Sequence, residues 1–196
     1  LSVLKEMKKE GRVRYIGIHH LAFLADMAMP AFGDLESIMR NEPIDFVGTD
    51  YSVGDRRAEE VILPLAQERK IASMAYFPFD PRRIFQRASN TALPAWAADF
   101  DAKSWAQFFL KYVISHPAVT VARVGTTKVH HMVDNMGGGM GRLPDEPTRK
   151  QMAAVVDALP ALPPLPQNPA AAPGIAVATA VLDRYVGEYK AASGFT

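Results

Sequence analysis

Apolar and polar positions follow two alternating periods along the chain, and these periods predict strands and helices in turn. Short apolar, β-rich runs predict four buried strands, at residues 11–18, 44–48, 71–77 and 118–124. Amphipathic or capped segments predict helices at residues 1–10, 31–41, 55–70, 105–116, from about 128, and 146–158. Such alternation is typical of a parallel sheet built from βαβ units. Four strands could form an open sheet or half of an eight-stranded barrel.

The helix before the fourth strand has the strongest pattern. Its apolar residues fall at i, i+3, i+4, i+7 and i+8, and they are Trp105, Phe108, Phe109, Tyr112 and Val113. In an earlier helix, Asp55 is expected to act as the N-cap and the helix to run to about Lys70. Pro64 lies inside that segment, so we expect it to kink or interrupt the helix.

Composition divides the chain into three parts. Residues 1–158 form the predicted α/β domain, and six of the fifteen prolines lie between Pro160 and Pro173, among alanines. This composition predicts a stiff, extended linker at residues 159–175. Residues 176–196 are expected to be a tail or the stub of a further segment. The chain starts in a helix and without methionine, so we expect a preceding segment to have been removed.

Charge and cysteine content argue against several kinds of partner and of chemistry. The formal charge is +1 without a basic run, which argues against nucleic acid and acidic membrane surfaces. The absence of cysteine excludes disulfides, thiolate nucleophiles and sulfur-ligated metals. No apolar run reaches 18 residues, and the first helix is charged rather than signal-like, so a cytoplasmic location is the default expectation.

The segment "VGTTK" is the first candidate site. Gly125 would let backbone approach a ligand, and Thr126 and Thr127 would place hydroxyls beside the free N–H groups of a new helix. An anion could be held there by amides and hydroxyls together. The alternative is an ordinary turn with a threonine N-cap.

Histidine and serine patterns offer further candidate sites. The pairs His19–His20 and His130–His131 diverge on a strand or helix and lack metal-ligand spacing, so no metal is expected. Ser2 and Lys5 have the Ser-x-x-Lys spacing of some hydrolases, without the companion motifs. Tyr76 ends the third strand, where a parallel α/β fold binds its ligands, and could stack on a heterocycle or cover the core.

Several ordered segments resemble the carboxy-terminal half of an aldo/keto reductase. They are "LKEMKKEGRVRYIGI", "TDYSVGDRRAEEVILPLAQERKIASMAYFPF", "SWAQFFLKYVISHPAVT" and "GTTKVHHMVDNMGGGMGRLPD". The resemblance covers about residues 1–158 and implies a (β/α)₈ barrel of TIM type. This chain would hold strands five to eight, the second half of that barrel.

The resemblance also implies an NADP(H) site. It places the grip on the adenosine 2′-phosphate and adenine at Gly125, Thr126, Thr127, Lys128, His131 and Asn135, and the nicotinamide stack at Tyr76. His19 and His20 stand where the family has a Ser-Asn pair for the carboxamide, and Gly48 stands where it has glutamine. An arginine often clamps the 2′-phosphate at the position of His131, so the preference for NADP over NAD is weakened.

Three functions follow as expectations. The first is an NADP(H)-dependent oxidoreductase that reduces small-molecule carbonyl substrates, inactive as this chain because the Asp, Tyr, Lys and His tetrad of the family lies in the other half. No catalytic residue is therefore assigned. The second is a non-catalytic half-barrel that forms homo-oligomers through its open edges. The third is a serine hydrolase, suggested by Ser2 with Lys5 and by a tail that resembles a segment following β-lactamase-like hydrolases.

Overall fold

A computed structural model describes residues 1–20, 33–80 and 83–163. The chain divides into two compact units, Leu1–Leu162 and Pro163–Thr196, and the description below concerns the first. The predicted tail or stub at residues 176–196 lies outside the described residues.

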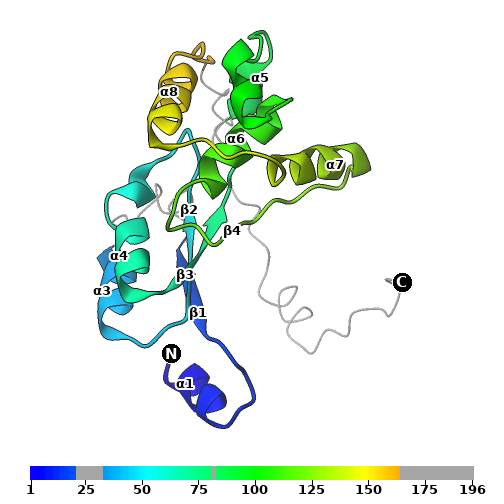
Figure 1. The fold of residues 1–196 in the computed structure, drawn as a ribbon. Coiled ribbons are helices and arrows are strands. Elements are labelled where there is room, and N and C mark those ends of the chain that lie inside the picture. The colour runs from blue at the N-terminus through cyan, green and yellow to red at the C-terminus, as the bar shows by residue number, and fades with distance from the viewer. Residues whose placement is uncertain (21–32, 81–82, 164–196) are drawn as a thin grey trace, which may run out of the picture. The chain divides into compact units, whose positions relative to one another are not determined.

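Four parallel strands form the sheet, in the order β1-β2-β3-β4. The strands are β1 (Gly17–His20), β2 (Phe46–Asp50), β3 (Ala72–Tyr76) and β4 (Val121–Ala122). Each strand therefore pairs with the next one in sequence, and β1 and β4 are the two edges (Figure 1). The predicted parallel α/β sheet is confirmed.

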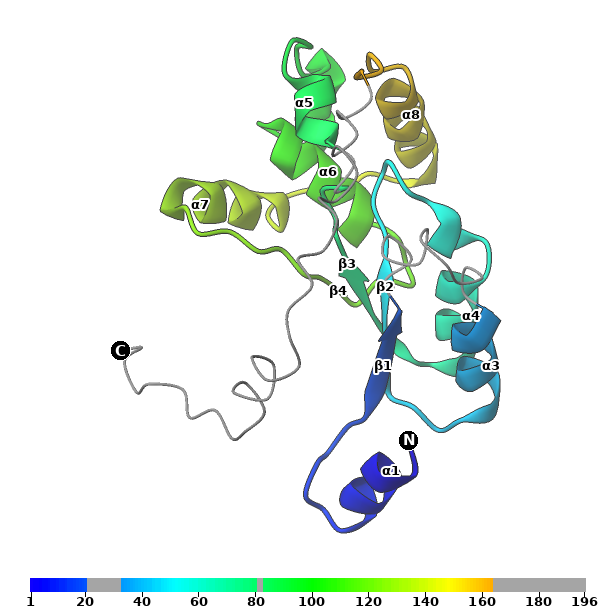
Figure 2. The ribbon, with the colours of Figure 1, turned by 180° about the vertical axis from the view of Figure 1, so that it is seen from behind.

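Helices fill the connections between strands. Those from the N-terminus to β3 are α1 (Ser2–Lys9), α3 (Gly33–Asn41), the 3₁₀ turn η1 (Arg57–Glu59) and α4 (Ile62–Arg69). After β3 come α5 (Ile84–Ala88), the 3₁₀ segment η2 (Ala95–Phe100), α6 (Trp105–Ile114), α7 (Val129–Gly138) and α8 (Glu146–Asp157). Figures 1 and 2 show α3 and α4 side by side along one side of the strands, with α7 extending away on the other side, beyond β4.

Three sequence predictions need correction. The first strand is Gly17–His20 rather than residues 11–18, because ladder pairing begins only where Gly17 meets Phe46. The fourth strand shrinks to two residues at the edge of the sheet. The predicted helix at residues 55–70 is broken before Pro64, between η1 and α4. Pro64 lies in the first turn of α4, where its missing N–H has no intrahelical acceptor to lose, so it causes no kink.

Among the described residues, helices cover one face of the sheet and leave the other open. Val47, Thr49, Ser73 and Ala75 are fully or almost fully buried, on the face that the helices cover. The alternate residues of the edge strands are exposed, including Gly17, His19 and Val121. Because neighbouring strand residues point to opposite faces, the second set belongs to the face that lies inside a closed barrel. This open face carries part of the candidate site.

The core between sheet and helices depends on α6. Phe108, Phe109, Tyr112 and Val113 are buried, as the helical spacing predicted, and Trp105 packs against the core from its edge. Ser104 caps the helix, because its Oγ accepts the Gln107 N–H at 3.1 Å. The cap fixes where α6 begins and so positions the residues at its N-terminus.

Candidate functional site

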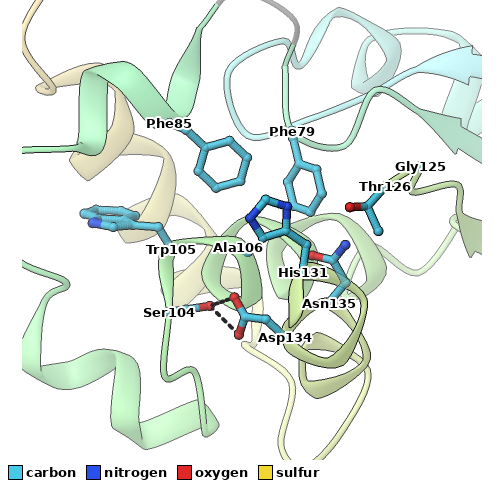
Figure 3. Close-up of a pocket in the computed structure, with 10 residues that line it drawn as sticks. All are labelled: Phe79, Phe85, Ser104, Trp105, Ala106, Gly125, Thr126, His131, Asp134 and Asn135. Atoms are coloured by element: carbon cyan, nitrogen blue, oxygen red, sulfur yellow. Dashed lines mark hydrogen bonds between the residues drawn. The ribbon is translucent and has the colours of Figure 1, made fainter. Parts of the chain in front are cut away.

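Two hollows concern the candidate site, one near the carboxyl ends of the strands and one on the sheet itself. The larger is a pocket of about 570 Å³ between the α5, α6 and α7 segments (Figure 3). It is lined by Phe79, Phe85, Ser104, Trp105, Ala106, Gly125, Thr126, His131, Asp134 and Asn135. The smaller, of about 200 Å³, lies on the sheet and includes His19, Gly48, Met74 and Tyr76. Parallel α/β folds bind ligands at this end of their strands.

Aromatic rings form one wall of the large pocket. Phe79 and Phe85 have ring centres 5.1 Å apart, and Phe85 meets the buried Phe109 edge to face at 5.5 Å. Trp105 stacks on Phe109 at 5.4 Å, and its indole N–H donates to the Thr91 carbonyl at 2.9 Å. The wall is therefore held by packing on α6 and offers a rigid apolar surface.

A hydrogen-bonded carboxylate forms the floor of the pocket. The Ser104 hydroxyl lies 2.8–2.9 Å from both Asp134 oxygens, and the Gln107 amide donates to Asp134 at 2.8 Å. These contacts hold α7 against the start of α6. Ser104 also accepts the capping bond from Gln107, so its hydroxyl has a structural role. Among the described residues, no histidine is placed to activate it as a nucleophile.

A close approach of α6 and α7 makes those bonds possible. A Cβ at Gly138 would lie 2.9 Å from the Cβ of Leu110, closer than real contacts allow. Glycine at this position therefore lets the helices pack together. The buried Lys111 ammonium then donates to the carbonyls of Met140 and Arg142, beyond the end of α7. Burial lowers the pKa of Lys111.

The predicted corner at the start of α7 is formed, and four of its residues line the large pocket. These are Gly125, Thr126, His131 and Asn135. The Thr126 Oγ accepts the Lys128 N–H at 3.1 Å, which turns the chain into the helix at Val129. The N–H groups of the first helical turn have no acceptor within the helix. Thr127 and Lys128 are exposed at this corner, outside the pocket lining.

The second group of predicted residues meets on the open face. The rings of His19 and Tyr76 lie 5.7 Å apart with a tilt of 31°. A Cβ at Gly48 would come within 2.4 Å of the Tyr76 ring, so only glycine leaves room for this arrangement. His20 follows His19 on the strand, and its side chain points to the opposite face. The structure therefore brings His19 to Tyr76 and leaves His20 apart.

The other candidate chemistries have structural partners instead. Lys5 pairs with Glu42, so its ammonium is engaged away from Ser2. His130 and His131 lie with ring centres 4.4 Å apart. His131 lines the pocket and His130 does not.

Across residues 1–20, 33–80 and 83–163, no three His, Asp or Glu side chains gather closely enough to hold a metal ion. Within the same ranges, no helix is long and apolar enough to cross a membrane.

Six pocket residues escaped the sequence prediction: Phe79, Phe85, Ser104, Trp105, Ala106 and Asp134. Ser104 and Trp105 carried a signal as the N-cap and first residue of a strong helix, and Asp134 is adjacent to a predicted residue. Phe79 follows β3 and Phe85 lies in α5, and the sequence pattern does not define how this segment packs. Their role depends on tertiary structure.

Comparison with known proteins gives one family. The family model "Aldo/keto reductase family" matches residues 1–155. An uncharacterized oxidoreductase of Schizosaccharomyces pombe is 25% identical over 135 residues, which cover 69% of this chain and 40% of that protein.

Solved structures show the same fold. A thermostable aldo-keto reductase, Tm1743, in complex with the inhibitor epalrestat has a TM-score of 0.55 and 21% identity, covering 79% of this chain and 53% of that one. An apo aldo-keto reductase from Bacillus halodurans has a TM-score of 0.55 and 19% identity, covering 78% and 54%. The chain thus spans about half the length of these structures and less than half of the yeast relative. Its four-stranded sheet is a partial barrel, and the chain belongs to the aldo/keto reductase family.

Proposed function

We propose that this chain forms the cofactor-binding half of an NADP(H)-dependent carbonyl reductase. The observation that supports this most strongly is the large pocket, where Gly125, Thr126, His131 and Asn135 meet an aromatic wall. A pocket with one apolar wall and a few polar groups suits a heterocycle joined to a phosphate. Because the chain belongs to the aldo/keto reductase family, we assign an NADP(H) site to these pocket residues.

The corner suits the 2′-phosphate of the adenosine. A Cβ added at Gly125 would meet nothing within 4 Å, so the backbone there is open to a ligand. The N-terminal amides of α7 and the positive end of its dipole favour an anion, and the Lys128 ammonium adds charge. Asn135 is largely buried and lines the same pocket, where its amide can both donate to and accept from a base edge.

The residues around Tyr76 fit the nicotinamide half of the cofactor less completely than the corner fits the adenosine half. The Tyr76 ring offers a flat surface at the end of β3, and His19 can donate to or accept from an amide. A glutamine at position 48 would collide with Tyr76 as it now lies. The bound cofactor would supply the hydride, while the residues of this chain orient its two ends. We therefore expect the adenosine half to contribute most of the affinity.

Replacing Thr126 with alanine tests the proposal. Loss of the hydroxyl removes the acceptor of the Lys128 N–H and a donor at the phosphate, so affinity for 2′,5′-ADP should fall about tenfold. Lys128→Ala should cause a similar loss, because a charged contact is removed. Thr126→Ser keeps the hydroxyl and is the matched control. Calorimetry that finds equal affinity for all four chains would refute the assignment of this corner.

Self-association is a second candidate function, favoured by an exposed apolar stripe on α7. Val129, Met132, Val133 and Met136 share one helix face at i, i+3, i+4 and i+7, and their exposed fractions are 41–81%. The edge strands β1 and β4 also have a free side within the described residues. A second copy of the chain could cover these surfaces.

Light scattering at micromolar concentration should therefore give a dimer or larger species. Val133→Glu places a charge in the stripe and should weaken association at least tenfold, which is about 1.4 kcal/mol. Gln151→Glu adds the same charge on the exposed side of α8 and should leave the mass unchanged. A monomeric wild-type chain would exclude this candidate.

A further inference from the structure

His131 is a pocket residue of the kind whose charge changes near neutral pH. It lies in the first turn of α7, and Figure 3 shows its imidazole pointing into the large pocket. Within residues 1–20, 33–80 and 83–163, no hydrogen bond or ion pair engages this imidazole, although its ring packs edge to face against His130 at 4.4 Å. Its nitrogens can therefore bind a ligand of the pocket.

A second side chain indicates a polar ligand at the same place. Asn135 lines the pocket and is only 8% exposed, and its amide makes no hydrogen bond within the described parts of the chain. A buried amide without a partner costs free energy, so it favours a polar occupant of the pocket. Asn135 follows His131 by four residues, so the two side chains share one face of α7.

The other groups that face the pocket leave His131 as its source of positive charge. Among the described lining residues, Asp134 is the other ionisable group, and its carboxylate is held on α6 by Ser104 and Gln107 at 2.8–2.9 Å. The segment after β3, α5 and the start of α6 contribute side chains without charge, which are Phe79, Phe85, Trp105 and Ala106. An anion in the pocket would interact with His131 while the carboxylate stays bound to α6.

Other basic residues adjoin the corner outside the pocket lining. Lys128 precedes α7 and is exposed, and His130 is the neighbour of His131 on the helix. Lysine keeps its charge throughout the neutral range, so the charge of the corner varies there through histidine. The positive end of the α7 dipole disfavours a further cation until an anion arrives. Protonation of His131 and binding of a phosphate therefore favour each other.

We propose that His131 makes the selectivity for the 2′-phosphate depend on pH, an inference that rests on the proposed binding of NADP(H) at this corner. An arginine stays charged at every physiological pH, whereas an imidazole loses its charge between about pH 6 and pH 8. The cationic form would donate a charged hydrogen bond to the phosphate, and the neutral form would hold it less tightly. The chain would therefore discriminate between NADP and NAD most strongly under mildly acidic conditions.

Titrations of 2′,5′-ADP at pH 6, 7 and 8 with the wild type and with His131→Gln measure this contribution. Glutamine keeps a donor without the charge, and His131 is exposed, so the substitution should leave the fold intact. The wild type should bind about tenfold more tightly than His131→Gln at pH 6 and within about twofold of it at pH 8. The phosphate also titrates, with a second pKa of about 6, but this acts on both chains and leaves their ratio unchanged.

Two variants and one ligand serve as controls. In His131→Arg the affinity for 2′,5′-ADP should not fall between pH 6 and pH 8, because the charge is permanent. His130→Gln removes the imidazole that lies outside the pocket lining and should keep the wild-type affinity at each pH. AMP lacks the 2′-phosphate, so it should bind the wild type and His131→Gln alike.

The outcomes separate this inference from the proposed function. If 2′,5′-ADP binds more tightly than AMP but the ratio of wild-type to His131→Gln affinity is the same at all three pH values, His131 does not control the selectivity. An equal loss in His130→Gln would also overturn its role, because the effect would then be one of general charge. Equal binding of 2′,5′-ADP and AMP at every pH would overturn both proposals.

Discussion

Replacing Arg149 with methionine is expected to lower the free energy of unfolding by roughly 3 kcal/mol, the lower end of the range for breaking a buried ion pair. Arg149 is only 4% exposed and joins α8 to the rest of the domain. Its guanidinium donates to the Tyr51 hydroxyl at 2.7 Å and to Glu59 at 2.8 Å, and it also donates to the Tyr112 carbonyl. It lies 4.2 Å from the centre of the Tyr112 ring.

The loss of stability arises from the groups that lose their hydrogen-bond donor when Arg149 is replaced. Methionine can fill much of the space but cannot donate, so Glu59 would keep a carboxylate among two tyrosines with less compensation. Burial raises the pKa of both Tyr51 and Tyr112, with Glu59 contributing in the same direction. Both phenols therefore stay neutral and donate to Glu59, but neither supplies the positive charge that is lost. The side chain of Glu59 is 31% exposed, so water offsets part of the penalty.

Urea denaturation followed by far-UV circular dichroism measures the effect. The midpoint temperature should also fall by roughly 6–12 °C for a chain of this size. Lys150→Met is the matched control, because Lys150 is the next residue, is 78% exposed and pairs with Glu146 only at 3.7 Å. That control should change stability by less than about 0.5 kcal/mol. Equal effects of the two substitutions would show that the buried network does not stabilise the domain.

The second large effect concerns activity. We expect this chain alone to show no NADPH-dependent reduction of aldehydes above the uncatalysed rate. A general acid typically contributes about 10²–10⁴-fold, and the resemblance assigns that role to a tetrad outside this sequence. The two tyrosines with a perturbed pKa, Tyr51 and Tyr112, are buried against Glu59 and Arg149 and have a raised pKa, which opposes ionisation.

Binding must be measured on the same sample so that inactivity is not confused with unfolding. A chain that binds 2′,5′-ADP and still does not reduce an aldehyde panel would agree with the proposed role as a cofactor-binding half. Robust turnover on any aldehyde would contradict it and would require an acid within these residues. Tyr76→Phe would then be the first variant to examine, because Tyr76 lies on the open face.

Much of the fold could be predicted because it depends on local patterns. The spacing of Phe108, Phe109, Tyr112 and Val113 predicted both the helix and its buried side. The predicted ends of the strands were less accurate, since pairing with a neighbouring strand decides where a strand begins, as at Gly17. The position of Pro64 shows a similar limit. Whether proline kinks a helix or starts one depends on where the preceding turn ends.

In the candidate site too, residues that are close in sequence could be predicted, and residues brought together by packing could not. Gly125, Thr126, His131 and Asn135 are close in sequence, so one turn and one helix bring them together, and a motif could identify them. Phe79 and Phe85 reach the pocket only through the packing of other segments.

The most direct test of the cofactor assignment is a titration of the wild-type chain with 2′,5′-ADP and with AMP, followed by backbone amide chemical shifts. The two ligands differ in the 2′-phosphate, so the comparison isolates the anion held at the start of α7. We expect tighter binding of 2′,5′-ADP, with the largest shifts at residues 125–131 and further shifts at Asp134 and Asn135. Equal binding of the two nucleotides, or no shift at residues 125–131, would show that this segment is only a turn and a helix start.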